Sequence, residues 1–464
     1  MNDITAFFAF LKYCLGYKGN MSRVVAGMDW QMLYSFASKQ ALLGLCFEGI
    51  ERLGKEYPEE LRMHPIGREL LMTWMGKAQQ IRRQNRKVNI VASKLFSMLR
   101  EDGMRCCILK GQGNALMYPN PYSRTPGDID VWIDASRERI MEYAQKKFEL
   151  GDDIRLQHLE TSLDGVPVEL HFFPCSMNNP IYHARLQKWF RRNADLQCSH
   201  IVGLPDGAGD IAIPTTAFNV VYQLTHLYHH FFDQGIGMRQ IIDYYHVVCD
   251  FYKVYQKSSK ITPSLFTLKE GSTSHPDPLT LRGEGGNRPT RCSEPLRSKV
   301  GGPSKVSPDC AGWDRWGVSG DTSSVSGSSA SGSSTAVTSS ASTALDVVQR
   351  DLKYLGLWKF AGAVMYVLHE VLGLSEDKMI VPVDEKRGKL LLAEILDGGN
   401  FGRHFTKYAG FTHQSMGKKY FLKIWRNMHF VRYYPAEALS EPIFRTWHFF
   451  WRLKHRRPSL GVFS

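Results

Sequence analysis

A long tract nearly free of large apolar residues divides this chain and limits how much of it can fold. Residues 319–344 read SGDTSSVSGSSASGSSTAVTSSASTA, and the stretch before them, from about Lys257, is rich in Pro, Gly and scattered basic residues. Such compositions bury too little apolar surface to offset the entropy of ordering, which is typical of flexible segments. The sequence therefore predicts a disordered insertion over residues 257–345 between two ordered portions.

The remaining composition is that of a globular protein. The chain has 464 residues, of which 43% are hydrophobic and 22% charged, and its formal net charge is +13. Its mean hydropathy is −0.28, and no unbroken apolar stretch has the roughly 18 residues that a membrane span requires. The N-terminus lacks the basic-then-apolar order of a secretory signal. We therefore expect a cytoplasmic protein without a transmembrane segment.

Cysteine usage supports the same compartment. The chain has nine cysteines, an odd number, and they include no Cys-x-x-Cys pair. Neither a disulfide framework nor a zinc knuckle fits this pattern. The sequence predicts reduced, mostly buried thiols.

The first ordered portion switches between helical and strand patterns. Apolar residues at three- and four-residue steps predict a helix that ends near Gly103: Val88, Val91, Leu95, Met98 and Leu99. A short buried strand follows at residues 105–109, and alternating strands at 127–134 and 166–173 flank a helix from Ser136 to Leu150. Residues 181–255 and the portion after 345 have helical periodicity. This order predicts an α/β (α+β) fold.

Three carboxylates on the predicted strands are the most informative feature. Asp128 and Asp130 stand two residues apart on a strand and therefore point the same way. Their charges would repel each other unless a divalent cation such as Mg²⁺ bound between them. Glu169 on the later strand supplies a third carboxylate. Such a set can hold two metal ions, one activating an attacking hydroxyl and one stabilising leaving pyrophosphate, which is the chemistry of nucleotidyl transfer.

The turn before these strands has features that suit a triphosphate. Gly111 and Gly113 would let backbone N–H groups approach anionic oxygens, and the following segment NALMY can begin a helix whose N-terminus favours phosphate. Lys110 and Arg124 are cations on the same stretch. Each signal is weak alone, because an Asp-x-Asp on a strand is usually solvated polar alternation. Their order along one segment is more specific.

With these motifs the chain resembles the polymerase-beta-like nucleotidyltransferase superfamily, and within it the uncharacterised bacterial nucleotidyltransferases. The resemblance rests on ILKGQGNALMYPNPYSRTPGDIDVWID, on VPVELHF and on HLYHHFFDQGIGMRQIIDYY, and covers roughly residues 85–250. No Ser follows Gly111, which departs from the Gly-Ser phosphate turn of the superfamily.

The resemblance implies roles for individual residues. Asp128, Asp130 and Glu169 would be catalytic residues and ligands of Mg²⁺ or Mn²⁺, with Glu169 also the base for the acceptor hydroxyl. The residues implied to bind the NTP substrate, expected to be ATP, are Lys110, Gly111, Gly113, Arg124, Gly127, His171 and Arg239.

The resemblance also implies an architecture. A small mixed-sheet nucleotidyltransferase core over residues 85–180 would be embedded in helices. An N-terminal helical region (1–84), a helical region packing on the core (181–256), the insertion (257–345) and a helical, basic aromatic C-terminal region (346–464) would complete the chain.

Two classes of function remain open. The leading one is a Mg²⁺-dependent transferase that moves an NMP from an NTP to a hydroxyl-bearing acceptor and releases pyrophosphate. The acceptor can be a small molecule, a glycan precursor, an RNA end or a protein. The alternative is a catalytically degenerate nucleotide-binding or interaction module of the same fold, binding RNA through the C-terminal region.

Histidines and one arginine downstream of the strands are weaker candidates. His226, His229 and His230 lie at helical spacing that can bind zinc, although a helix packed on the sheet would look the same. Arg239 and Asp243 are four residues apart, which favours an ion pair between them. Alternatively, Arg239 or a histidine lines the nucleotide pocket.

Two further histidines flank the third carboxylate in the sequence. His158 and His171 are expected near Glu169, where His171 would either bind a phosphate or orient the acid. A purely structural role fits these histidines equally well.

The C-terminal end combines basic and aromatic residues. From Gly417 onward ten Lys and Arg face two acids, Glu437 and Glu441, and aromatic residues stand between them. This pattern suits an anionic partner such as nucleic acid or a membrane surface. It is equally typical of a helical domain with an aromatic core and a basic rim.

Overall fold

The computed structural model describes residues 3–150, 155–258, 339–405 and 416–455. Most of the predicted insertion over 257–345 lies outside these residues. The helices on either side of it end at Ser258 and begin at Ser339, earlier than the expected resumption near Leu345. The described residues before and after it belong to one compact unit.

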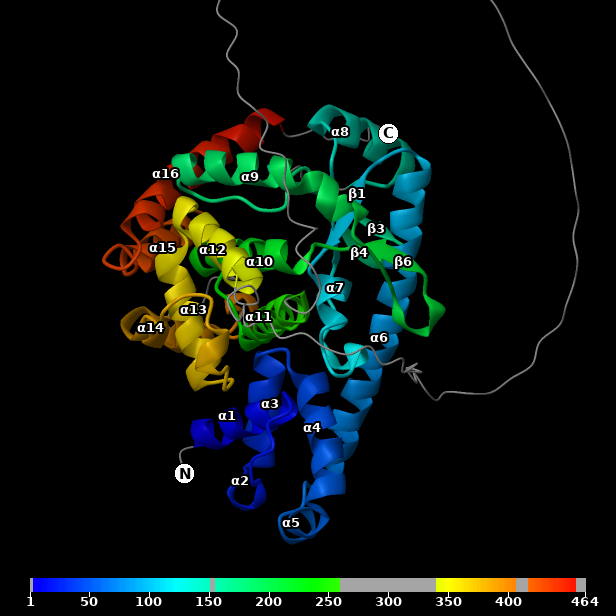
Figure 1. Cartoon of the computed structure of the whole chain (residues 1–464), viewed down its shortest axis with the longest axis vertical. Helices are drawn as coiled ribbons and strands as arrows, with labels where there is room; N and C mark the ends of the chain where they lie inside the picture. Colours follow the sequence, from blue (N-terminus) through cyan, green and yellow to red (C-terminus); the bar gives the residue numbers. More distant parts are fainter. Residues whose placement is uncertain (1–2, 151–154, 259–338, 406–415, 456–464) are drawn as a thin grey trace, which may run out of the picture. The chain divides into compact units, whose positions relative to one another are not determined.

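Helices dominate the described residues, and two small sheets accompany them (Figure 1). The N-terminal helices are α1 (Asp3–Cys14), α2 (Ser22–Ala26), α3 (Trp30–Lys39), α4 (Leu43–Glu56), α5 (Pro58–Met63) and α6 (Arg68–Glu101). The central helices are α7 (Gly111–Ala115), α8 (Arg137–Lys147), α9 (Pro180–Ser199), α10 (Thr216–Asp233) and α11 (Met238–Ser258). The C-terminal helices are α12 (Ser339–Tyr354), α13 (Trp358–Glu370), α14 (Glu385–Gly398), α15 (Met416–Met428) and α16 (Pro435–His455).

A four-stranded mixed sheet forms the centre of the fold. Its strands are β1 (Cys106–Leu109), β2 (Ile129–Ile133), β3 (His158–Leu163) and β4 (Val166–His171), in the order β1-β2-β4-β3. β2 and β4 are parallel, whereas the two outer strands run antiparallel to their neighbours. The register sets Asp130 opposite Glu169 and Glu169 opposite Glu160, so these three residues share one face.

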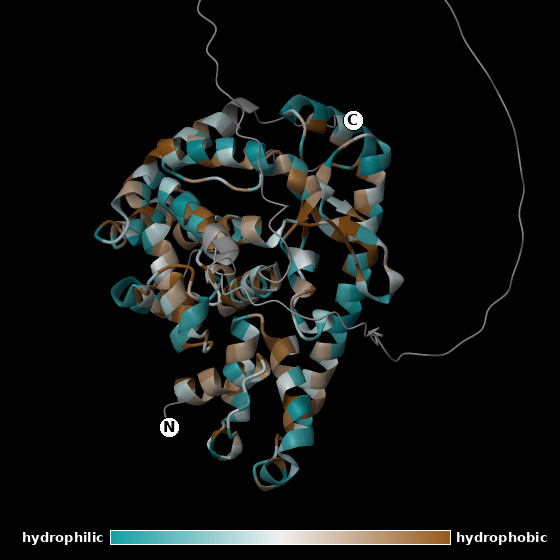
Figure 2. Cartoon of the chain, viewed as in Figure 1, coloured by the Kyte–Doolittle hydropathy of each residue, from teal (hydrophilic) through white to brown (hydrophobic). Residues whose placement is uncertain are grey.

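The two faces of this sheet have different neighbours. On one face Ile129, Val131 and Leu170 pack with apolar residues of α6 and α8. At one end of the other face, Trp132 stacks on Phe218 of α10, with ring centroids 6.2 Å apart. Figure 2 shows the apolar character of the strands, in brown, beside the polar outer surface of α8. The rest of the second face carries the carboxylates and histidines.

Helix α6 joins the sheet to the N-terminal helices. Its C-terminal half packs on the sheet through Val88, Val91 and Leu95, as the periodicity predicts, and Trp74 in its N-terminal half donates to Leu43 O on α4 at 2.9 Å. The expected boundary between residues 84 and 85 therefore falls inside one continuous helix.

Two close turns bring the C-terminal portion against the centre of the fold. A Cβ on Gly402 would lie 1.9 Å from Gln234 O, and a Cβ on Gly237 would lie 2.7 Å from the Cα of Asn400. Only glycine permits this approach between the turn at 234–237 and the 3-10 turn η4 (Asn400–Gly402). The contact fixes Phe401, whose φ is +55°, beside α10 and α11.

The α/β class with a small mixed sheet and a helical C-terminal region is confirmed. β3 was not predicted, because the residues on one of its faces are polar. The hairpin of β5 (Ile201–Gly203) and β6 (Asp210–Ala212) lies inside a stretch expected to be helical. Three-residue strands are too short to show an alternation. The cysteines of the described residues are free thiols, and Cys46, Cys106, Cys107 and Cys175 are buried. Within those ranges no helix combines the length and apolarity that crossing a membrane requires.

Candidate functional site

The three predicted carboxylates meet on the open face of the sheet. Asp130 on β2 is paired in register with Glu169 on β4, and Asp128 lies just before β2. Asp130 is 5% exposed, whereas Asp128 is exposed at the edge of the same site. The negative charge of Asp130, with a further contribution from Glu169, raises the pKa of Asp128 to about 6. This is the repulsion that the Asp-x-Asp pattern predicts.

Two cations of the chain already contact Asp130. Its Oδ1 atom lies 3.0 Å from Lys110 Nζ and 3.0 Å from His171 Nε2. Burial alone would raise the pKa of Asp130, but these two groups outweigh it and hold that pKa well below its usual range. Asp130 is therefore an ionised carboxylate inside the fold.

His171 connects two of the carboxylates. Its Nε2 atom also lies 3.1 Å from Glu169 Oε2, and the side chain is almost fully buried. Burial lowers the pKa of His171, yet the hydrogen bonds to Asp130 and Glu169 raise it to about 9. Of the roles that the sequence left open, this geometry favours orienting the acid over binding a phosphate.

His158 extends the same group of side chains. Its Nδ1 atom lies 3.3 Å from Glu169 Oε2, and one ligand atom each from His158, Glu169 and His171 all lie within 4.8 Å of one another. Burial lowers the pKa of His158 to about 4, so this ring is neutral near pH 7. The expected position of both histidines beside Glu169 is confirmed.

The turn after β1 has an unusual backbone. Lys110 has φ +50° and Gly111 has φ +34°, so the chain reverses sharply as the strand ends. α7 begins at Gly111, three residues before the expected helix start at Asn114. It ends at Ala115 and has only five residues. Left-handed backbone at a non-glycine residue is costly and concentrates at functional sites. Here it places Lys110 between Asp130 and His226, whose Nε2 is 2.8 Å from Lys110 Nζ.

Gly113 is closely packed inside the fold. It lies inside α7, and a Cβ there would be 3.0 Å from Ile213. It is absent from the walls of both cavities described below. Close packing accounts for a glycine at this position.

Arg124 is paired with a buried carboxylate. Its Nε and Nη2 atoms each lie 2.8 Å from an oxygen of Asp243 on α11, and Tyr118 donates to the same carboxylate at 2.8 Å. The expected pair between Arg239 and Asp243 is wrong, because Arg239 donates to Thr125 O at 3.0 Å and Arg124 occupies Asp243. A positive charge at Arg124 is thus already offset.

Helix α6 anchors the loop that leads to the aspartates. Asn85 is fully buried and donates to the carbonyl oxygens of Tyr122 at 3.1 Å and Arg124 at 2.8 Å. Together with the contacts from α11, these bonds fix the chain just before Gly127 and Asp128.

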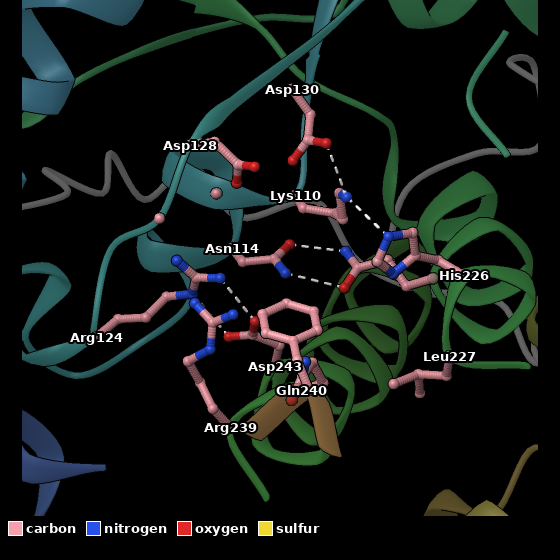
Figure 3. Close-up of a pocket in the computed structure, with 14 residues that line it drawn as sticks. Lys110, Asn114, Arg124, Asp128, Asp130, His226, Leu227, Arg239, Gln240 and Asp243 are labelled. Atoms are coloured by element: carbon pink, nitrogen blue, oxygen red, sulfur yellow. Dashed lines mark hydrogen bonds and ion pairs between the residues drawn. The ribbon is translucent and has the colours of Figure 1, made fainter. Parts of the chain in front are cut away.

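A smaller cavity of about 60 Å³ lies between the aspartates and α11. In Figure 3, Asp128, Asp130 and Lys110 stand at one end of this smaller cavity and Arg124, Arg239 and Asp243 at the other. Its walls are Lys110, Gly111, Asn114, Arg124, Gly127, Asp128, Asp130, Gln223, His226, Leu227, Arg239, Gln240, Asp243 and Phe401. Arg239 and one histidine, His226, both line this cavity.

A larger cavity of about 360 Å³ begins at the same aspartates and extends toward α16. It shares Lys110, Asp128, Asp130, His226 and Phe401 with the smaller cavity. Glu169 and His171 line only the larger one. Farther along, its walls include the other two α10 histidines, Asp233, Phe444 and Arg445.

The histidines of α10 are not arranged as a metal site. Lys110 Nζ and His230 Nε2 lie 2.8 Å and 3.0 Å from the same atom, His226 Nε2. An ammonium group therefore stands where a cation would bind. Burial, with the Lys110 charge next, lowers the pKa of His226 well below its usual value.

Several wall residues were missed in the sequence. Asn114 and Gln223 exchange two amide hydrogen bonds, at 2.9 Å and 2.7 Å. Gln223 precedes His226 by one helical turn, so helical spacing could have placed it on the same face. No local pattern points to Phe401, because it joins the site from beyond residues 257–345.

The C-terminal basic residues are partly used inside the fold. Arg426 is 3% exposed and donates to Phe231 O at 2.8 Å, and Arg445 contacts Asp233 at 3.0 Å. Trp425, Trp447 and Phe450 are exposed by half or more. For these residues the arrangement is the reverse of an aromatic core with a basic rim.

Comparison with known proteins relates part of this chain to nucleotidyltransferases. Residues 26–255 match the family model described as uncharacterised nucleotidyltransferase. A solved structure, an antigenic nucleotidyltransferase-like protein from Paracoccidioides brasiliensis, is similar at 18% identity and a TM-score of 0.25, over 35% of this chain and 75% of that one. No curated protein matches the chain. The family match supports a relationship to nucleotidyltransferases. The matched residues include the four-stranded sheet, Asp128, Asp130, Glu169 and Arg239.

Proposed function

We propose, from the nucleotidyltransferase family match of residues 26–255, that this chain transfers an NMP group from an NTP, preferably ATP, to an acceptor hydroxyl. The reaction is of the polymerase-beta-like type. One observation carries the proposal: Asp128, Asp130 and Glu169 line a single cavity directly beside the Lys110–Gly111 turn.

The donor chemistry of the three carboxylates suits a divalent cation, although the described residues whose ligand atoms all lie within 4.8 Å of one another are His158, Glu169 and His171. Three carboxylates open onto one cavity, and the raised pKa of Asp128 records a repulsion that a bound cation would relieve. Asp128, Asp130 and Glu169 would hold Mg²⁺ or Mn²⁺. When bound, such ions would neutralise the triphosphate and polarise the reacting oxygens.

The transfer can be written with the chain's own residues. The acceptor oxygen bonds to the α-phosphorus, the bond from that phosphorus to pyrophosphate breaks, and the acceptor proton passes to Glu169. His171 holds Oε2 of Glu169 at 3.1 Å, which leaves Oε1 to take the proton. Lys110 and Arg239, on the walls of the smaller cavity, supply positive charge to the triphosphate.

One observation favours the alternative of a binding module without turnover. Asp130 is contacted by both Lys110 and His171, so the acidic centre is partly neutralised by the chain itself. A module that binds nucleotide without chemistry would tolerate this arrangement.

The experiment that separates the two measures NTP binding and pyrophosphate release on the full chain. With Mg²⁺ and a panel of acceptors, we expect binding of a non-hydrolysable ATP analogue and acceptor-dependent release of pyrophosphate from ATP. Binding without release would establish the module, and the absence of both would contradict the proposal.

A matched pair of variants locates the activity. Asp128→Asn should abolish release while leaving the free energy of unfolding unchanged or slightly raised, because the repulsion from Asp130 disappears. Asp164→Asn, on the exposed turn between β3 and β4, is the control and should behave as the wild type.

A further inference from the structure

The two cavities differ in which carboxylates they contain. Asp128 and Asp130 line both, Glu169 lines only the larger one, and Gly111 and Gly127 line only the smaller one. The proposed base thus faces the larger cavity, and the proposed phosphate turn faces the smaller. If the proposed function holds, the smaller cavity, of about 60 Å³, receives only phosphate groups of the NTP, and the acceptor binds in the larger one.

We propose that the larger cavity binds a small, neutral, polyhydroxylated molecule, of the sugar or polyol class, as the acceptor. The proposal rests on the proposed function and adds the class of its second substrate. It excludes the RNA end and the protein side chain that the sequence leaves open.

The size of the cavity is the first argument. Its volume of about 360 Å³ lies at the lower end of the range for small-molecule sites, roughly 300–1,000 Å³. A bound nucleic-acid strand would require a longer positively charged groove with successive stacking platforms.

The pairing of its charges is the second argument. Arg445 contacts both Asp233, at 3.0 Å, and Glu441 of its own helix. Asp233 also receives Lys423 at 3.1 Å, and Arg155 contacts Glu160 at 2.7 Å. Arg445, Asp233, Glu441 and Arg155 belong to the wall, whereas Lys423 and Glu160 lie outside it and each offsets the charge of one wall residue. An acceptor with a phosphate group would find little net positive charge there, apart from the exposed Arg403.

The neutral polar groups of the wall are the third argument. Gln157, Ser176 and Asn178 line the part near Glu169, and His229 and His230 line the part toward α16. Burial lowers the pKa of His229 and lowers that of His230 to about 3, so both rings are neutral donors and acceptors. Hydroxyl groups are suitable partners for such a set.

Aromatic rings complete the wall. Phe401 and Phe444 both line the larger cavity, one from the turn after α14 and one from α16. Flat apolar faces next to many neutral hydrogen-bonding groups suit a ring that carries C–H groups on its faces and hydroxyls around its edge.

The test measures binding to the full chain without NTP or metal, so its outcome is independent of turnover. Saturation-transfer NMR is recorded with glucose, galactose, trehalose and myo-inositol, and in parallel with glucose 6-phosphate and a short oligoribonucleotide. We expect at least one neutral compound to bind and the two anionic probes to bind more weakly. Binding of an anionic probe alone, or of none, overturns the proposal.

Variants on α16 assign the binding to the larger cavity. Phe444→Ala should weaken binding of the neutral compound about two- to tenfold, the value of one aromatic contact, and Phe444→Trp should weaken it by filling the space. Phe449→Ala, at an exposed position of the same helix outside the cavity, should leave it unchanged. Equal binding by all three variants, with wild-type unfolding midpoints, places the compound elsewhere and overturns the proposal.

The outcome is separable from that of the proposed function. Release of pyrophosphate with an RNA end and not with a neutral compound would retain the transferase and overturn only the acceptor class. Binding of a neutral compound that depends on Phe444, without any NTP binding, would retain the cavity assignment and contradict the transferase.

Discussion

The two cavities share one pair of aspartates but are built from different parts of the chain. Apart from Phe401, every wall residue of the smaller cavity lies within residues 26–255, the segment that matches the nucleotidyltransferase family. The larger cavity adds residues of α16 and of the turn after α14, which follow that segment in sequence. The proposed chemistry thus depends mainly on the family-matched segment, whereas the proposed second substrate would also contact a surface that the rest of the chain supplies.

The largest expected effect comes from comparing a variant of Asp130, which lines both cavities, with a variant of Glu169, which lines only the larger one. Asp130→Asn should lose metal-dependent ATP binding and reduce transfer on the order of a thousandfold, because a preorganised charge is removed from both cavities. Glu169→Gln should reduce transfer to a similar extent but retain ATP binding. Calorimetry with the ATP analogue and a pyrophosphate assay distinguish the two variants. Equal loss of ATP binding in both would show that the cavities do not divide the substrates.

The buried ion pair under the smaller cavity should dominate stability. Arg124→Met leaves the Asp243 carboxylate buried without its guanidinium, which should cost about 3–5 kcal/mol of the free energy of unfolding. Arg124→Met with Asp243→Leu should recover part of that loss, measured by urea denaturation. Lys94→Met removes the exposed pair with Asp164 and should cost less than about 1 kcal/mol. A loss from Arg124→Met no larger than that control would contradict the buried pair.

Next to Asn178, a wall residue of the larger cavity, the buried carboxylate of Glu437 should make stability depend on pH. Glu437 in the first turn of α16 accepts the N–H groups of Asn178 at 2.6 Å and Asn179 at 3.2 Å, and burial raises its pKa to about 7. The folded state therefore holds the proton more tightly than the unfolded state. Protonated Glu437 therefore contributes its full stabilisation at low pH. The free energy of unfolding falls by up to about 3 kcal/mol as the pH rises through about 7.

Glu437→Gln keeps an oxygen acceptor and removes the titration. Urea unfolding at about pH 5 and about pH 8 should show a smaller decline for this variant than for the wild type. Glu385→Gln, at an exposed position in the first turn of α14, is the matched control and should retain the wild-type decline. The same decline in all three proteins would contradict the raised pKa of Glu437.

The sequence predicted the parts of the site that depend on local order. Alternation placed Asp128 and Asp130 on one strand, and the Lys110–Gly111 turn was identified from its residue types. Pairings between distant residues were not visible: Arg124 and Asp243 are 119 residues apart, and the nearer Arg239 was assigned in place of Arg124. Periodicity reports which face a residue takes on its own element, but not which element packs against that face.

Phe401 illustrates the same limit and gives the smallest expected effect. Its ring lies 5.6 Å from the Arg239 guanidinium carbon and 5.4 Å from the His230 ring, and it lines both cavities. Removing the ring in Phe401→Ala should raise KM for ATP and for the acceptor by about two- to tenfold each. A change in only one KM would assign Phe401 to one cavity and contradict its position as a wall between them.

A second substitution at this position separates the ring from the backbone that carries it. At φ +55° an L-residue pays roughly 1–2 kcal/mol that glycine does not, and the close approach of Gly402 to Gln234 O fixes the turn in this conformation. The free energy of unfolding of Phe401→Gly should therefore be about 1 kcal/mol larger than that of Phe401→Ala. Both variants should show the same rise in KM. If Phe401→Gly is the less stable of the two, the turn is not constrained in the left-handed region, and the ring alone determines the position of this wall.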